Sequence, residues 1–264
     1  MPSRDGLIRP KAATRATRTL VAVPVYNEAK HVEQVLRRVL EFAPPPGTVL
    51  IIDDGSTDAT PSLLARFPVE VIRHSHNRGY GRSMQDAFRW AIVDDYDWLI
   101  TMDCDEQHEP AAIPEFTAAA EGGLDVVSGS RYLIDDPTGS NPPKDRRAIN
   151  AQITAELNER LGLKLTDAFC GFKAYRVDAL RRLALDADGY AFPMQFWVQA
   201  VAEGLRIKEI PVKLIYNDMN RTFGGPLNDP AVRLNHYRCV LHRELRRCAD
   251  RLPRTALPAQ AVCD

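Results

Sequence analysis

The chain has 264 residues and a formal net charge of −1, which is long enough for the core of one large α/β domain. Basic residues concentrate near both ends, so the middle is acidic, which argues against a nucleic-acid-binding core and suits a metal-cation site. The five cysteines form no CxxC pair, which argues against a disulfide framework and a zinc site. No apolar run approaches the roughly 20 residues needed to span a bilayer. We therefore expect a cytoplasmic protein.

The first half of the chain alternates between two kinds of segment. Residues 1–18 are polar and basic, which predicts a flexible arm. Apolar strand-like runs then follow, and the first four each precede a helical pattern. These runs are TLVAVPVY, TVLIID, VEVIR, DWLITMD and LDVVSGS. Because the runs are apolar throughout, they predict a mostly parallel sheet with helices on both faces.

Beyond Tyr132 the alternation loosens. Helical patterns cover about residues 147–161, the segment FPMQFWVQAVAEG and a last segment after residue 228. RIKEIPVKLIY is typical of two short strand pieces about Pro211, at an edge of the sheet. We therefore expect an arm over 1–18, one α/β domain over 19–228 and a C-terminal amphipathic helix and tail over 229–264. That helix suits an anionic membrane surface, or it packs on its own domain.

Polar side chains follow four of the predicted strands, at the sheet edge where ligands bind in such folds. The clusters are Asn27-Glu28, Asp53-Asp54, MDCDEQHEP over 102–110, and Ser130-Arg131. Like charges crowded in MDCDEQHEP raise one another's pKa unless a cation neutralises them. Mg²⁺ or Mn²⁺ accepts such oxygen ligands and keeps positions open for phosphate. The alternative is a polar loop whose acids face water or cap the helix near Pro110.

Six motifs carry a resemblance to a known family. They are PVYNE at 24–28, DDGSTD at 53–58, NRGYG at 77–81, MDCDEQHEP at 102–110, GSRY at 129–132 and GFKAYR at 171–176. In this order they resemble the family 2 glycosyltransferases, and more narrowly the polyprenyl-phosphate (dolichyl-phosphate) mannosyl- and glucosyltransferases. The resemblance covers about residues 19–225 and implies a GT-A fold with a Rossmann-like central sheet.

The resemblance also implies a UDP- or GDP-hexose as donor, with Mg²⁺ or Mn²⁺. Its nucleotide-binding positions fall on Pro24, Tyr26, Glu28, Ile52 and Asp54. Its metal motif falls on Asp103, Asp105 and Gln107, and includes Cys104, whose side chain we expect to point into the packing.

Two arginines complete the positions that the resemblance implies. Arg131 would reach the diphosphate or an acceptor phosphate, and Arg221 matches a basic position in the late loop NDMNRTFGG, which has no lysine. Three of the assigned or neighbouring residues also have structural interpretations. Tyr26 suits a core edge, Asp53 a turn and Arg131 a surface ion pair.

The implied reaction is an inverting displacement at the anomeric carbon. Many relatives place an acidic pair where this chain has Gln195 and Gln199, so no base stands there. A phosphate acceptor needs none, because it is already ionised, which agrees with a polyprenyl phosphate. For a hydroxyl acceptor, Asp167 is the alternative base, unless it is a cap or an ion pair.

Other classes of protein stay open. They are a transferase to a soluble hydroxyl acceptor, a retaining transferase, and a non-catalytic nucleotide-sugar-binding protein. A nucleotidyltransferase is less favoured, because PVYNEAK lacks the glycine-rich phosphate loop. No nucleic-acid partner is expected, whereas a lipid acceptor would imply peripheral contact with the inner face of a membrane.

Overall fold

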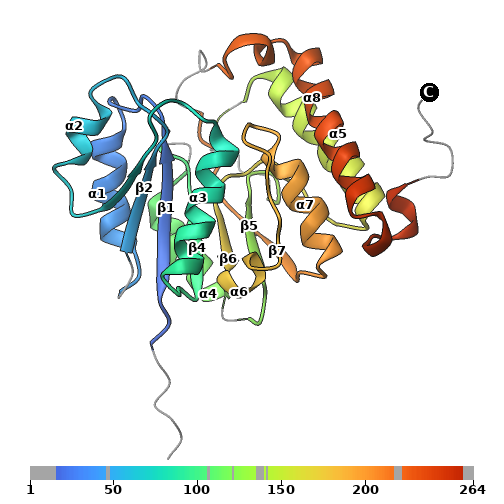
Figure 1. Ribbon diagram of the computed structural model, residues 1–264, viewed down its shortest axis with the longest axis horizontal. Helices are drawn as coiled ribbons and strands as arrows, with labels where there is room; N and C mark the ends of the chain where they lie inside the picture. The colour runs from blue at the N-terminus through green and yellow to red at the C-terminus, as the bar shows by residue number, and fades with distance from the viewer. Residues whose placement is uncertain are drawn as a thin grey trace, which may run out of the picture.

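The computed structural model describes residues 16–45, 48–105, 108–120, 122–134, 140, 142–216 and 222–257. These residues form a seven-stranded sheet with helices packed on both of its faces (Figure 1). Most of the paired strands are parallel. The predicted α/β architecture, a mostly parallel sheet between layers of helices, is confirmed.

The order of the strands across the sheet is β3-β2-β1-β4-β6-β5-β7. Their bounds are β1 Thr19–Val25, β2 Thr48–Asp53, β3 Glu70–Arg73, β4 Trp98–Thr101, β5 Val126–Ser130, β6 Lys173–Arg176 and β7 Ile207–Pro211. β6 runs antiparallel to both of its neighbours, β4 and β5. β7 lies at the edge, as predicted, but it ends at Pro211 and residues 212–216 form no second piece.

Eight α-helices of the described chain surround the sheet. They are α1 Val32–Phe42, α2 Thr60–Leu64, α3 Tyr80–Val93, α4 Ile113–Ala120, α5 Lys144–Leu161, α6 Val177–Leu180, α7 Phe192–Ala202 and α8 Pro230–Arg247. Local chemistry fixes some of their ends. Gly162 ends α5 at a φ of 68°, which favours glycine. Asp229 caps α8 by accepting from the backbone N–H groups of Ala231 and Val232, just before Pro230.

The alternation of side chains along β1 divides the core into two layers. Leu20 and Ala22 belong to the layer beneath α3, α5, α7 and α8, whereas Val21 and Val23 belong to the layer beneath α1 and α4. Both faces of the strand are therefore fully buried, which explains why its sequence is apolar throughout. The polar loops that follow β1, β2 and β4 leave the sheet at one common edge, because these strands run parallel.

The apolar side of α8 is occupied by the rest of the protein. Tyr237, Leu241 and Leu245 are buried in the same core layer as α5 and α7. Figure 1 shows α8 lying beside α5. Of the two alternatives for this amphipathic helix, packing on its own domain is the one seen in the structure. Within the described ranges, no helix has both the length and the apolar character to cross a bilayer.

Candidate active site

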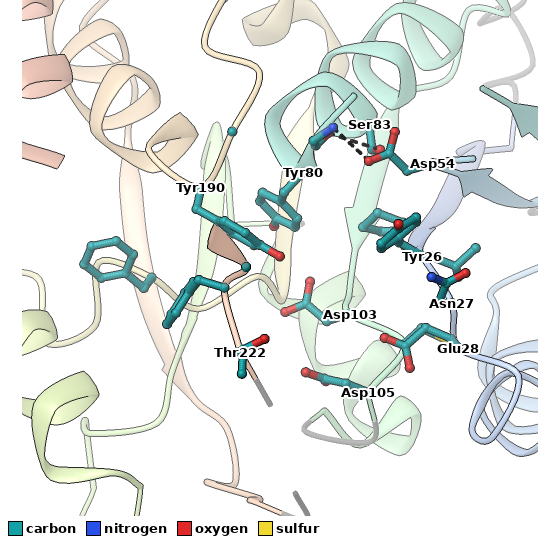
Figure 2. A pocket seen from close by; sticks show the side chains of 18 of the residues that line it. Tyr26, Asn27, Glu28, Asp54, Tyr80, Ser83, Asp103, Asp105, Tyr190 and Thr222 are labelled. Carbon is teal, nitrogen blue, oxygen red and sulfur yellow. Dashed lines mark hydrogen bonds between the residues drawn. The ribbon is translucent and has the colours of Figure 1, made fainter. Parts of the chain in front are cut away.

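A cavity of roughly 1070 Å³ opens at the carboxyl edge of the sheet. Its wall is formed by segments from both halves of the chain: the loops after β1, β2, β4 and β5, the start of α3, part of α5, residues 189–193, the loop before α8, and α8 itself. Figure 2 shows side chains from these segments pointing toward one space. The topology therefore places the predicted polar clusters around one cavity, large enough for a sugar nucleotide.

Acidic side chains occupy the part of the cavity next to β2, β1 and β4. The carboxylates in its wall are Glu28, Asp54, Asp58, Asp103 and Asp105. Asp103, Asp105 and Glu28 face the same space in Figure 2. Gly171 makes room for Asp103, since a Cβ there would lie 2.5 Å from one of its carboxylate oxygens. We call this acidic part the donor end.

The pair Asp103 and Asp105 fits a divalent cation of the Mg²⁺ kind. Such ions take one or two carboxylates and complete their shell with water and phosphate oxygens. Among the described residues, no three His, Cys, Asp or Glu side chains form a ready-made metal cluster, so a cation would depend on further ligands. Gln107, the third predicted ligand, lies outside the described residues.

His108 supports the loop that carries Asp103. Burial lowers the pKa of His108 to about 4, so the ring is neutral near pH 7. Its Nδ1 accepts a hydrogen bond of 3.1 Å from the Asp103 backbone N–H. Cys104 is 2% exposed and packs in the core under β1 and β4, as expected, although it also borders the cavity.

Asp54 organises the start of α3 as well as lining the cavity. Its Oδ1 contacts His74 Nδ1 at 2.6 Å and accepts from the Arg78 N–H at 2.7 Å, while Oδ2 accepts from the Gly79 N–H at 2.8 Å. Pro24, Tyr26 and Glu28 also lie in the wall. Tyr26 is 44% exposed, so its ring is available at the rim rather than at a core edge.

Two residues of the second strand do not reach the cavity wall. Ile52 is fully buried in the core, on the face of β2 that packs beneath α3, so the structure does not support its predicted place beside the nucleotide base. Asp53 accepts from the Ser56 N–H at 2.9 Å and pairs with Arg73 at 3.3 Å. The turn interpretation of Asp53 agrees with these contacts.

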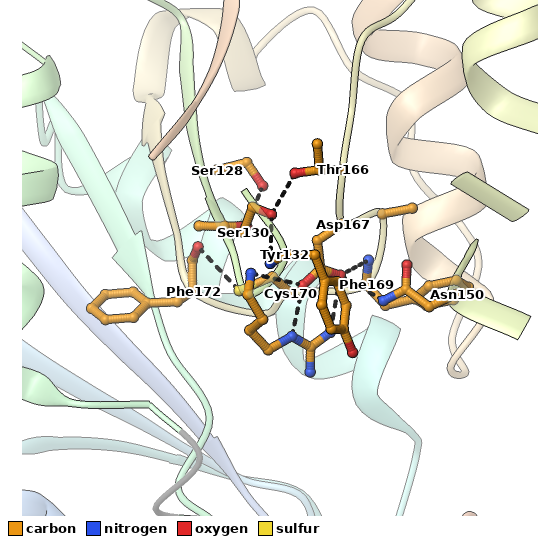
Figure 3. A network of polar contacts seen from close by, with 12 residues as sticks. Ser128, Ser130, Tyr132, Asn150, Thr166, Asp167, Phe169, Cys170 and Phe172 are labelled. Carbon is orange, nitrogen blue, oxygen red and sulfur yellow. Dashed lines mark hydrogen bonds and ion pairs between the residues drawn. The ribbon is translucent and has the colours of Figure 1, made fainter. Parts of the chain in front are cut away.

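Arg131 and Asp167 form a bidentate buried ion pair beside the cavity, where β5 ends. Arg131 Nε donates to Asp167 Oδ2 at 2.7 Å, and Nη2 donates to Oδ1 at 3.0 Å. The Asp167 carboxylate also accepts from Asn150 Nδ2 and from the backbone N–H groups of Phe169 and Arg131. Figure 3 shows the network around Asp167. Arg131 lines the cavity, whereas Asp167 is fully buried behind it.

The contacts of Asp167 argue against the predicted role of general base. Burial alone would raise the pKa of Asp167, but the charge of Arg131 and the hydrogen bonds outweigh burial and hold this pKa well below its usual range. A carboxylate that is fully buried and already accepts five hydrogen bonds cannot reach an acceptor hydroxyl. The ion-pair alternative therefore describes Asp167, and its role is to position Arg131.

Gln195 and Gln199 are structural residues of α7. Both are buried and donate to the carboxylate of Glu244 on α8, at 3.0 Å and 2.6 Å. Their carbonyl oxygens accept from backbone N–H groups in the segment 184–187. Neither glutamine lies in the cavity wall.

Arginines and aromatic rings occupy the part of the cavity next to β5, α5 and α8. The side chains here are Arg131, Tyr132, Arg146, Asn150, Phe169, Tyr190, Tyr216, Phe223, Arg233 and Tyr237. The sequence did not single out Arg146 or Arg233, because they come from helices whose place at the site depends on tertiary packing. The adjacent arginines 146 and 147 in PPKDRR are the one local feature of the sequence that could have indicated Arg146. Arg221 lies outside the described residues. We call this part the acceptor end.

Comparisons with known proteins agree with this architecture. Residues 20–184 match the family model of glycosyl transferase family 2. An undecaprenyl-phosphate mannosyltransferase of Micrococcus luteus is 32% identical, over 83% of this chain and 93% of the relative. A polyprenol monophosphomannose synthase of Mycolicibacterium smegmatis is 30% identical, over 76% and 79% of the two chains.

Solved structures resemble the fold. Glucosyl-3-phosphoglycerate synthase of Mycobacterium tuberculosis, solved with Mn²⁺, UDP and glucosyl-3-phosphoglycerate, superposes with a TM-score of 0.66 at 18% identity, over 90% of this chain and 81% of that one. At this identity the likeness concerns architecture alone. The mixed α/β sheet with its covering helices has the GT-A fold of glycosyltransferases.

Proposed function

Because the chain belongs to glycosyl transferase family 2, we propose that this glycosyltransferase moves a hexose from a nucleotide-diphosphate sugar to a polyprenyl phosphate. The names of the two relatives above support the acceptor class, since one is an undecaprenyl-phosphate mannosyltransferase and the other a polyprenol monophosphomannose synthase. The proposed substrates are a water-soluble nucleotide sugar and a membrane lipid. They suggest a cytoplasmic enzyme with peripheral contact at the inner face of the membrane.

The observation that carries the proposal is the division of charge within the cavity. The five described carboxylates of its wall follow β1, β2 and β4, where they outnumber Lys30, whereas the three arginines follow β5 or belong to α5 and α8. A diphosphate with a bound cation suits the acidic end, and an anionic acceptor suits the basic end. The aromatic rings at the basic end offer an apolar surface for the first part of a prenyl chain.

The donor is held at the acidic end in this proposal. Tyr26 offers a flat ring at the rim for the nucleotide base, while Glu28 and Asp54 offer carboxylate oxygens to donors of the nucleoside. Asp103 and Asp105 would hold Mg²⁺ or Mn²⁺, which when bound supplies positive charge for the departing diphosphate.

The transfer step needs no proton acceptor from the protein. An ionised phosphate oxygen of the acceptor attacks the anomeric carbon, a new carbon–oxygen bond forms, and the bond to the diphosphate breaks with its electron pair leaving on the nucleoside diphosphate. Arg131, fixed by Asp167, lies where it can orient one of the two phosphates. We expect inversion at the anomeric carbon, since one displacement occurs.

The test is a transfer assay with UDP- and GDP-hexoses and a short-chain polyprenyl phosphate, with and without Mn²⁺. We expect transfer to the phosphate but not to the polyprenol of the same chain length. Asp105→Ala should lower metal-dependent turnover by about a hundredfold or more, because the diphosphate loses its charge partner. Asp178→Ala is the matched control, since that side chain is 88% exposed and pairs only with Arg181 among the described residues. Transfer to polyprenol, or full activity in Asp105→Ala, would contradict the proposal.

A further inference from the structure

Helix α8 contributes directly to the cavity although it lies beyond the residues that the family model matches. Arg233 and Tyr237 from its first turns belong to the wall at the acceptor end. The Arg233 side chain is only 3% exposed. A buried guanidinium beside a cavity is costly unless it is bonded, so its partners indicate what it does there.

Three neighbours hold Arg233 in place. Its Nη2 donates to Asp145 Oδ2 at 2.5 Å, and its Nη1 donates to the Leu227 carbonyl at 2.8 Å. Its guanidinium carbon lies 4.4 Å from the centroid of the Phe223 ring. A guanidinium has five N–H donors, and these two hydrogen bonds use two of them. Arg233 is therefore fixed but retains donors for a further acceptor atom.

Arg146 lies against the same aromatic ring. Its guanidinium carbon is 4.7 Å from the Phe223 centroid, and its Nη1 donates to the Tyr216 hydroxyl at 3.2 Å. Tyr190 contacts Phe223 edge-on, with centroids 5.2 Å apart. Phe223 thus contacts two guanidinium groups, one from α5 and one from α8, and both arginines line the cavity. The segment around Phe223, residues 222–228, carries no cation of its own.

We propose that Arg233 is an acceptor-binding residue: together with Arg146 on the shared Phe223 ring, it binds the phosphate group of the acceptor. The inference rests on the proposed function, in which the acceptor carries a phosphate. Two guanidinium groups held by packing suit a phosphate because neither has to be ordered when an anion binds. Helix α8 is then part of the substrate site and helps to select an anionic acceptor over a neutral one.

A purely structural role for Arg233 makes a different prediction. In that case Arg233 would act only by joining Asp145, at the start of α5, to the loop that contains Leu227. Removing either partner of the Arg233–Asp145 pair would then weaken acceptor binding alike. If Arg233 binds the phosphate, Asp145→Asn should leave acceptor binding unchanged or tighter, because the amide oxygen can still accept from Arg233 Nη2 while the competing negative charge is removed. The two roles therefore differ in the expected effect of Asp145→Asn.

The experiment compares Arg233→Met, Arg233→Lys, Asp145→Asn and wild-type protein. KM and kcat are measured for a short-chain polyprenyl phosphate and for the donor, and direct binding of the same polyprenyl phosphate and its polyprenol is measured without donor. Arg233→Met should raise the acceptor KM by about ten- to a hundredfold, with the donor KM unchanged, because a charged hydrogen bond is lost. Arg233→Lys should recover part of this loss. Arg238→Met is the control, since Arg238 also lies on α8 but pairs with Glu156 outside the cavity wall.

The outcomes separate this inference from the proposed function. If wild-type protein neither binds nor uses a polyprenyl phosphate, the proposed function fails and the inference falls with it. If wild-type protein uses it and Arg233→Met does so equally well, only the inference is overturned. A loss in Asp145→Asn as large as that in Arg233→Met also overturns it. If Arg233→Met does not fold, Asp145→Asn still separates the two roles, because it weakens acceptor binding only if Arg233 acts through its link to Asp145.

Discussion

Asp167 fixes Arg131 through both of its oxygens, and neither residue has another buried partner of opposite charge in the described contacts. We expect Asp167→Asn to destabilise the fold by about 3–5 kcal/mol, because removing one partner leaves a buried charge uncompensated. Turnover should fall as well, since Arg131 would lose its orientation. Urea unfolding of both proteins, with circular dichroism as the signal, measures the change in the free energy of unfolding.

The pH dependence distinguishes this role from general-base catalysis. The pKa of Asp167 is lowered in the folded state, so its contribution to stability is complete above the ordinary carboxyl pKa of about 3.9 and is lost only as pH falls through the lower folded-state pKa. The stability difference between wild type and Asp167→Asn should therefore be constant from about pH 5 to 8. If the turnover rate of the wild-type protein depended on the ionisation of one group in this pH range, and this dependence were absent in Asp167→Asn, Asp167 would be the base instead.

Residues in the loops after the strands could be placed from the sequence, whereas Ile52 inside β2 and the residues on distant helices could not. Besides Cys104, six predicted site residues in the described loops after these strands lie in the cavity wall, because parallel strands deliver the loops that follow them to one edge. These residues are Tyr26, Glu28, Asp54, Asp103, Asp105 and Arg131. Ile52 lies one step inside β2, where alternation turns it into the core.

The contact between the start of α3 and the segment 184–188 joins two elements that are far apart in the sequence. A Cβ on Gly81 would collide with the Ala187 carbonyl oxygen and would lie 2.9 Å from Phe192 Cβ. The Arg82 N–H donates to the Asp188 carbonyl at 3.0 Å across this contact. The glycine therefore allows the turn that Asp54 holds, at Arg78 and Gly79, to pack directly on this segment.

We expect Gly81→Ala to destabilise the protein by about 1–3 kcal/mol, because backbone must move to admit the methyl group. The direction of the change in stability is informative, since Gly→Ala at an open helix position would stabilise the protein by about 1 kcal/mol instead. The donor KM should also rise, because the same shift would disturb the turn at Arg78 and Gly79 that Asp54 holds. Gly122→Ala is the control, because a Cβ there would meet only the Ala119 carbonyl at 3.4 Å and Gly122 is not in the cavity wall. Thermal unfolding and donor KM of the two variants check this, and equal stability of the variants would count against close packing at Gly81.

The elements themselves were predictable where they were long and apolar. Apolar runs in the sequence predict strands β1, β2 and β4, whereas β6 has four residues and includes Lys173 and Arg176. Its position between β4 and β5 buries Lys173 beside the Trp197 ring. β4 is equally short but lies in an apolar run, whereas the charged residues of β6 leave no apolar run to detect. The reversal of direction within the sheet could not be inferred from composition.

Charge is distributed unevenly across the whole molecule even though the formal net charge is −1. Carboxylates surround the donor end, and guanidinium groups from β5, α5 and α8 surround the acceptor end. The basic C-terminal segment, which the sequence left open as a membrane-binding helix, faces the cavity through Arg233 and the core through Tyr237 and Leu241. We therefore propose that residues 19–228 and 229–264, although separable in sequence pattern, fold as one cooperative unit.

The last prediction tests this unit by truncation. Removing α8 would take the buried side chains of Leu241 and Leu245 out of the core, and burial of each contributes about 1.5–3 kcal/mol to stability. It would also leave the buried amides of Gln195 and Gln199 without their hydrogen-bond acceptor, the Glu244 carboxylate. These losses are comparable with the roughly 5–15 kcal/mol that stabilises a domain. A chain ending at residue 228 should therefore lack a cooperative urea transition and be cleaved rapidly by protease, whereas a chain ending at residue 257, which keeps α8, should unfold in one transition like the full chain. If the shorter chain instead unfolds at the wild-type midpoint, residues 19–228 are a domain in their own right and α8 is an addition to it.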